Sequence, residues 1–211
     1  GNGNFSYLDN YNEAEKVLLK EFTQTLYSVA DGVYMNVEFN PDYVKEYRLI
    51  GFDNKVGALR DSLSMVEGGE IGSGHSMMAM FEIIPTEKNI ATIKNESNDV
   101  TVANIKLTYN LPRQPQEYVF NYRCLLNFSS FDQLDKSYRF STAVSMFGAL
   151  LRESKFIRNT SFDDILKIGT TAINTNDLSQ KEFLNLVDQA KKLYSKTKKK
   201  KEKEKKDRQS Y

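Results

Sequence analysis

The chain has 211 residues and a mass of 24.2 kDa, a length that predicts one domain with an appendage rather than two full domains. Its composition is 40% hydrophobic and 27% charged with a net charge of +1, which is typical of a globular chain with a core and excludes a wholly disordered one. The single cysteine, Cys124, excludes a fold held together by internal disulfides. No apolar run approaches the roughly 18 residues that a transmembrane helix requires.

Charge is distributed unevenly along the chain. Residues 195–211 hold nine basic and three acidic side chains, a net charge of +6, whereas residues 1–194 hold 20 basic and 25 acidic side chains, a net charge of −5. Because a nucleic-acid-binding domain would carry a basic face, we expect no nucleic-acid partner. The like charges of residues 195–211 predict a Lys-rich disordered tail, and a weak contact of this tail alone with an anionic membrane surface or with nucleic acid stays open.

The first thirty residues are interpreted as the end of a domain whose beginning is missing. Residues 4–8 have the pattern of a short strand, and apolar residues recur every three or four positions from residue 12 to residue 29, which predicts a one-faced helix. A lone strand and helix cannot form a core by themselves. We therefore assign residues 1–30 to the terminal strand and helix of a truncated domain.

Alternation of apolar and polar side chains dominates residues 31–130. This two-residue period predicts half-buried strands, and residues 77–84, which are apolar at nearly every position, predict a strand covered on both faces. The alternating segments are residues 33–39, 46–52, 103–110 and 118–126. Five or more strands without intervening helices are typical of an antiparallel β-sandwich.

A helical period returns in residues 131–194 and predicts about three helices packed on the sandwich. The first begins near Asp135. Each of the other two has a serine followed three residues later by an acidic side chain, which is the pattern of a capping box. These pairs are Ser161 with Asp164 and Ser179 with Glu182. The predicted class is thus α+β, an antiparallel β-sandwich with one N-terminal helix and a C-terminal group of about three helices.

The densest cluster of glycine and polar residues is EGGEIGSGHS at residues 67–76. It is not a phosphate-binding loop, because His75 stands where such a loop requires lysine and a strand-like segment follows where it requires a helix. His75 is the only histidine of the chain, so sites that need two histidines are excluded. We assign no catalytic residue, no metal site and no cofactor.

Three interpretations of this segment stay open. Glycine-rich connections place backbone donors where a partner reaches them, which favours Glu70, Ser73 and His75 as binding residues. Alternatively, Glu70 and His75 hold a structural corner through hydrogen bonds to the backbone. In the third interpretation they join a distant carboxylate in a metal-assisted hydrolase, because zinc accepts such ligands. Cys124, on a predicted strand, is expected to be a small buried hydrophobe.

Several segments together resemble one known arrangement. Residues 1–22, GNGNFSYLDNYNEAEKVLLKEF, resemble the last strand and helix of a bacterial von Willebrand factor type A domain. The segments that follow are similar to the uncharacterised carboxy-terminal domain found after the A domain in YfbK-type bacterial proteins. The most specific of them are VEFNP, YRLIGF, GEIGSGH and FGALLR, in this order. The resemblance covers residues 2–190.

This resemblance implies a setting and a role. Family members usually carry an upstream signal or lipid anchor, which implies a lipoprotein or periplasmic protein of the bacterial cell envelope. The A domain of the family bears a metal-ion-dependent adhesion site built on Asp-x-Ser-x-Ser, which this chain lacks, since Asp61, Ser62 and Ser64 have the wrong spacing. The expected function is a non-catalytic accessory module for protein–protein binding or assembly. Its expected partners are the upstream A domain of the same protein and an unknown envelope protein, with membrane contact only through an upstream anchor or the basic tail.

Overall fold

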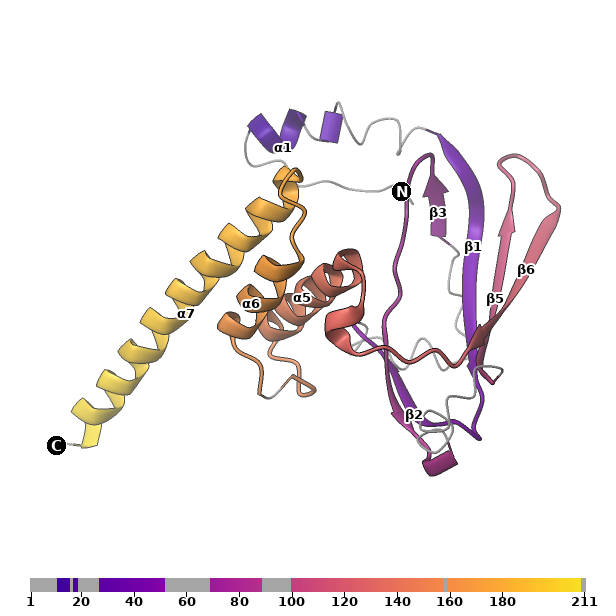
Figure 1. Cartoon of the computed structure of the whole chain (residues 1–211). Helices are drawn as coiled ribbons and strands as arrows, with labels where there is room; N and C mark the ends of the chain where they lie inside the picture. Colours follow the sequence, from indigo (N-terminus) through magenta and orange to yellow (C-terminus); the bar gives the residue numbers. More distant parts are fainter. Residues whose placement is uncertain are drawn as a thin grey trace. The chain divides into compact units, whose positions relative to one another are not determined.

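The computed structural model describes residues 11–15, 17–18, 27–51, 69–88, 100–157 and 159–209, and its side chains are described as far as residue 195. The chain divides into two compact units, residues 1–127 and residues 128–211. Antiparallel sheets characterise the first unit and helices the second (Figure 1). The predicted α+β class with antiparallel strands is confirmed.

A four-stranded antiparallel sheet forms most of the first unit. Its strands are β1 (Ser28–Phe39), β3 (Gly69–Gly72), β5 (Thr101–Asn110) and β6 (Glu117–Leu125). Their order is β3-β1-β5-β6, so that β1 and β5 are central and β3 and β6 lie at the edges of the sheet (Figure 1). The alternation predicted for residues 33–39, 103–110 and 118–126 is confirmed in β1, β5 and β6.

The two faces of this sheet differ in polarity. Residues opposite each other in antiparallel strands share a face, so the register of β1, β5 and β6 places whole rows together. One face carries the rows Val37–Ile105–Tyr122 and Met35–Leu107–Phe120, and the other carries Glu38–Asn104–Arg123 and Asn36–Lys106–Asn121. The sheet therefore has one apolar face and one polar face.

A second, two-stranded sheet pairs β2 (Val44–Leu49) with β4 (Phe81–Pro85). It meets the four-stranded sheet at the end of β1, where the Phe39 ring lies 4.5 Å from the Tyr47 ring and 5.3 Å from the Phe81 ring between centroids. Val44 of β2 and Ala103 of β5 are both buried. The stacking of the two sheets as the layers of a sandwich stays a prediction.

Several predicted elements of the first unit need correction. The helix predicted for residues 12–29 is described as α1 (Tyr11–Glu15), whereas Ser28 and Val29 already belong to β1 because this end of the strand pairs with β3. Residues 19–26 and the strand predicted at residues 4–8 lie outside the described residues. The strand predicted at residues 46–52 runs from Val44 to Leu49.

The apolar segment at residues 77–84 is not a strand covered on both faces. Only its end lies in β4, and the exposed side chains include Met77, Met78, Ile83 and Ile84. A continuous apolar run resembles a doubly covered strand in sequence, but here β4 has β2 as its described neighbour. The run is a largely exposed apolar segment.

The helical unit contains η2 (Phe131–Gln133), α5 (Lys136–Leu151), α6 (Phe162–Ala172) and α7 (Leu178–Gln209). The three α-helices supply a common core of fully or nearly buried side chains, which are Ala143, Phe147, Ile165 and Val187. Phe147 packs edge to face against Phe183 of α7 at 5.5 Å between ring centroids. The predicted helix starting near Asp135 is confirmed, and Asp135 is its N-cap.

Of the two predicted capping boxes, the first is confirmed and the second is wrong. At the start of α6 the Ser161 Oγ accepts a hydrogen bond from the Asp164 amide at 3.2 Å, and the Asp164 carboxylate accepts from the Ser161 amide at 2.9 Å. At the start of α7 the Asp177 Oδ1 accepts from the Ser179 amide at 2.9 Å. Asp177 takes the capping role predicted for Ser179, because its carboxylate precedes the helix directly.

The segment predicted as a disordered tail, residues 195–211, differs from that expectation. Helix α7 continues through it as far as Gln209. Lysine and glutamate are good helix formers, and no glycine or proline interrupts the segment. Among the described residues, no helix is both long enough and apolar enough to cross a bilayer.

Candidate functional site

The glycine-rich segment lies on an edge strand and the turn that follows it. Glu70 belongs to β3, while Ser73 and His75 come after the strand, and all three residues are exposed. The turn is held by the backbone: the Ser73 amide donates to the Tyr27 carbonyl at 2.8 Å and the His75 amide donates to the Gly72 carbonyl at 3.1 Å. Gly74 at φ +73° adopts the left-handed conformation that glycine accepts without strain.

Among the residues that the structure describes, the side chains of this segment form no catalytic arrangement. Within the described ranges, the bonds that hold the corner run from backbone to backbone, so the interpretation of Glu70 and His75 as a structural corner finds no support there. Nor do three side chains from His, Cys, Asp and Glu come close enough to hold a metal ion in the described part of the chain. The metal-assisted hydrolase gains no support from it, and the choice of Glu70, Ser73 and His75 as binding residues stays a prediction.

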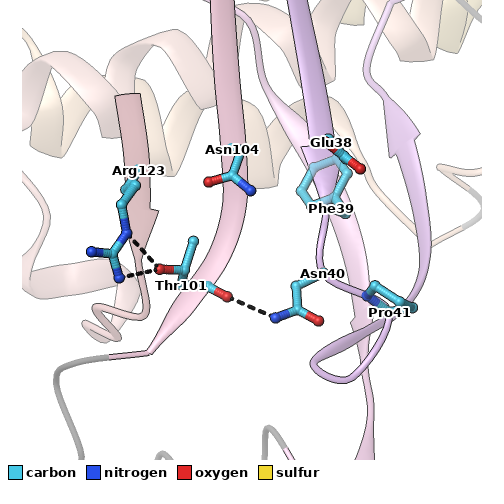
Figure 2. A pocket seen from close by; sticks show the side chains of 7 residues that line it. All are labelled: Glu38, Phe39, Asn40, Pro41, Thr101, Asn104 and Arg123. Atoms are coloured by element: carbon cyan, nitrogen blue, oxygen red, sulfur yellow. Dashed lines mark hydrogen bonds between the residues drawn. The ribbon is translucent and has the colours of Figure 1, made fainter. Parts of the chain in front are cut away.

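A second candidate is an open pocket of about 380 Å³ at one end of the four-stranded sheet (Figure 2). It is lined by Glu38, Phe39, Asn40, Pro41, Thr101, Asn104 and Arg123. Glu38, Asn104 and Arg123 form one cross-strand row of the polar face. A carboxylate, an amide and a guanidinium therefore lie side by side in the lining.

Thr101 organises the polar part of this pocket. Its hydroxyl accepts two hydrogen bonds from Arg123, one from Nε at 3.1 Å and one from Nη2 at 2.8 Å (Figure 2). Its carbonyl accepts a hydrogen bond from the Asn40 amide side chain at 3.1 Å (Figure 2). Because both contacts cross between strands, they fix Arg123 and Asn40 relative to the sheet.

The turn beside the pocket is fixed from the second sheet. The backbone carbonyl of Asn40 accepts from the Val44 amide at 2.9 Å. Lys88 Nζ donates to the Asp42 carboxylate at 2.7 Å, and this hydrogen bond raises the pKa of Lys88 above its ordinary value. The Thr86 hydroxyl donates to the Asp42 carbonyl at 2.6 Å.

The described residues of the pocket lining offer groups for hydrogen bonding. Nucleophilic catalysis needs a nucleophile and a base within hydrogen-bond reach. Among the described lining residues the one hydroxyl is that of Thr101, which already accepts from Arg123, and none is a histidine or a cysteine. Glu38, Asn104 and Arg123 together offer acceptors and donors to a polar group such as a peptide segment.

Sequence reasoning did not single out this pocket. The segment VEFNP, noted only as part of a resemblance, supplies Glu38, Phe39, Asn40 and Pro41. The other lining residues, Thr101, Asn104 and Arg123, come from strands far along the chain and join the segment only through strand pairing. The asparagine and proline that follow an alternating strand were the available signal, because these residues favour a fixed turn.

The apolar face of the four-stranded sheet is the third candidate. Its end near Phe39 contacts the second sheet, but side chains in the next two rows are exposed: Met35 is 49% exposed, Phe120 57% and Tyr122 56%. Cys124 lies on the same face and is half-buried, not fully buried as predicted. Contiguous exposed apolar side chains mark interaction sites in monomeric proteins.

Comparison with known proteins identifies the family of this chain. The sequence model described as "Uncharacterized protein YfbK, C-terminal" matches residues 24–193. The chain belongs to the family of YfbK carboxy-terminal domains. The resemblance to the YfbK carboxy-terminal domain is confirmed, whereas the resemblance of residues 1–22 to the end of an A domain stays a prediction. Neither this description nor that of the relative below names an enzymatic activity.

One relative is a longer protein than this chain. "Uncharacterized protein YfbK" of Escherichia coli (strain K12) is 29% identical to this chain, and the match covers 90% of the chain and 35% of the relative. The chain thus spans about a third of the length of that relative. No solved structure matches the chain significantly.

Proposed function

We propose that this YfbK carboxy-terminal domain is a non-catalytic protein–protein interaction module of a longer protein in the bacterial cell envelope. The observation that carries the proposal is the exposed part of the apolar face of the four-stranded sheet, formed by Met35, Phe120 and Tyr122. Large apolar side chains that lie exposed next to each other on one face of a sheet cost free energy in water unless a partner covers them. The pocket chemistry described above supplies binding groups and no nucleophile–base pair.

The proposed occupant of this face is the A domain that precedes the module in the same protein. The match with the E. coli relative leaves about two thirds of that protein outside this chain, which provides ample chain for a covering domain. A covalently linked domain has a high effective concentration at the face, so a modest apolar contact is sufficient. The envelope location belongs to the same proposal and rests on the family resemblance.

The test uses two neighbouring residues of β1. The region preceding this chain in the longer protein is produced separately and titrated with the chain by isothermal calorimetry. Met35→Glu places a charge on the apolar face, whereas Asn36→Glu places the same charge on the polar face of the same strand. Both side chains are exposed, so both variants are expected to fold, which circular dichroism verifies.

We expect Met35→Glu to weaken binding by at least about tenfold, because desolvating an unpaired carboxylate costs more than the corresponding 1.4 kcal/mol. Asn36→Glu should change the affinity less than about twofold, since a solvent-facing charge is not desolvated. Equal affinities of the wild type and Met35→Glu, or no binding by the wild type, would contradict the proposal.

A further inference from the structure

The two edges of the four-stranded sheet are built differently. Edge strand β3 has four residues, and its pairing with β1 is interrupted by two register shifts. Edge strand β6 has nine residues, contains no proline, and pairs with β5 without a shift from Cys124 to Glu117. Short and bulged edges discourage the addition of another strand, whereas a long regular edge permits it.

The outer side of β6 offers both backbone groups and apolar side chains. Among the described residues β5 is its only neighbour in the sheet, so alternate residues of β6 direct N–H and C=O groups away from β5. Val119 is 50% exposed, and Phe120 and Tyr122 are exposed to a similar extent. A strand added here would satisfy the backbone groups and cover these side chains.

Self-pairing of β6 is restricted by symmetry. When a two-fold axis relates two antiparallel edge strands within one continuous sheet, the axis is perpendicular to the plane of the sheet. Each face of one copy therefore continues into the same face of the other copy. Because opposed residues share a face, one residue must lie opposite its own copy. The central positions of β6 are Phe120, Asn121 and Tyr122, and Val119 lies one position further toward Glu117. With Tyr122 opposite its copy, Arg123 lies opposite Asn121 and Glu117 falls beyond the paired part of β6.

Charge distinguishes these registers. With Phe120 opposite its copy, Glu117 lies opposite Arg123 of the second copy, and this pair occurs twice. With Asn121 at the centre, Glu117 lies opposite Leu125 and Arg123 opposite Val119. With Val119 at the centre, Arg123 falls beyond the paired part of β6. Opposite charges directly across a strand pair stabilise it, so the first register is favoured.

We infer that two copies of this chain associate through antiparallel pairing of their β6 strands, with Phe120 opposite Phe120 and Glu117 opposite Arg123. The two sheets become one eight-stranded sheet. Its apolar face places Phe120 beside its copy and Tyr118 beside Tyr122 of the second copy. The Tyr118 ring stacks on Tyr109 of β5 at 5.5 Å between centroids.

The contact is tested by the mass of the protein in solution and by exchanging the charges of Glu117 and Arg123. Light scattering across a concentration series should give twice the chain mass of 24.2 kDa at high concentration. Glu117→Arg places two arginines opposite each other at both ends of the contact and should raise the dissociation constant about tenfold or more. The double variant Glu117→Arg, Arg123→Glu exchanges the charges and should restore dimerisation.

Glu46→Arg is the matched control. Glu46 is exposed on β2 in the second sheet, and the substitution makes the same charge change. Its dissociation constant should equal that of the wild type. Circular dichroism verifies that every variant is folded, so that loss of the dimer is separated from loss of the sheet.

The distance between Cys124 and its copy in the dimer distinguishes the registers. In the Phe120-centred register Cys124 and its copy are eight residues apart along the strands, about 27 Å at roughly 3.4 Å per residue. In the Asn121-centred register they are six residues apart, about 20 Å on the same basis. Pulsed electron spin resonance of spin-labelled Cys124 should give the longer distance, with the dimer mass of the labelled protein verified.

Any of four results would overturn this inference. A chain that remains monomeric at all concentrations leaves the β6 edge to a strand of another protein. A Glu117→Arg variant that dimerises like the wild type, or a charge exchange that does not restore the dimer, removes the Glu117–Arg123 pair. A Cys124 separation near the shorter distance assigns the other register.

Discussion

Two substitutions that delete the same number of carbon atoms should have very different effects on the helical unit. Ile165→Ala and Leu186→Ala each remove three side-chain carbons. Ile165 lies on α6 and is fully buried against Ala143, Phe147 and Val187, whereas Leu186 lies on α7 and is 52% exposed. The difference in unfolding free energy between the two variants therefore reports how deeply each side chain is buried and not how many atoms are removed.

The expected magnitudes follow from this burial. Removing three buried carbons from Ile165 costs about 2.4 kcal/mol in transfer free energy at about 0.8 kcal/mol per carbon. The cavity adds about 1 kcal/mol, and the better helix propensity of alanine returns about 0.4 kcal/mol, which gives a net loss of about 3 kcal/mol. Leu186→Ala loses less than about 1 kcal/mol, because half of its side chain already contacts water.

Urea unfolding followed by circular dichroism at the helical minimum measures both variants. With a slope of about 1–3 kcal/mol per molar urea, Ile165→Ala should lower the midpoint by about 1–3 M. Leu186→Ala should lower it by only a fraction of that amount. Equal midpoints for the two variants, or a lower midpoint for Leu186→Ala, would refute the packing of α5, α6 and α7 around Ile165.

Two further predictions concern local conformation. Ser161→Ala should cost about 1 kcal/mol at neutral pH through loss of the helix cap. The hydrogen bonds from the Ser161 side chain and amide lower the pKa of Asp164 below its ordinary value. This carboxylate therefore stabilises the fold above its ordinary pKa, and the contribution disappears as the pH falls through the folded-state pKa. Unfolding between about pH 2 and 7 should show a smaller difference between the wild type and the variant at the acid end, where the bond from the Asp164 amide to the Ser161 Oγ remains, and a constant difference would contradict the coupling. Gly32 lies at φ +57° in β1, and a Cβ atom added there would lie 3.3 Å from the Asn110 Oδ1. Gly32→Ala should therefore destabilise the sheet by about 1–2 kcal/mol. Gly32→Asn should destabilise it by less, since asparagine tolerates this backbone conformation better. Thermal unfolding followed in the strand region gives the order of stability, and an alanine variant as stable as the wild type would contradict the strained position.

The helices could be predicted because their determinants are local. The α6 cap depends on Ser161 and Asp164, which are three residues apart, and no distant group is required. The error at α7 has the same origin. Asp177 and Ser179 both have capping side chains within two residues, and the sequence does not distinguish which one precedes the helix.

The first strand and the pocket could not be predicted in the same way. Val29 fits a helical period with the residues before it, but its backbone belongs to β1, whose partner β3 comes much later in the sequence. The pocket likewise needs Asn40 and Thr101 together, and only the pairing of β1 with β5 brings them into contact. The polarity of each strand was readable, whereas its neighbours were not, because pairing is a long-range property.

The sheet order β3-β1-β5-β6 also has a consequence for how the chain folds. Strands β5 and β6 are joined by a short connection and can close as a hairpin early. Strand β1 pairs with β5 from Phe39 opposite Ala103 to Asp31 opposite Asn110, and every one of these pairs joins residues far apart in sequence, so its addition to the sheet requires closure of a long loop. We expect the hairpin and the helices to form first and the arrival of β1 to limit the folding rate, with the β5 edge uncovered until then.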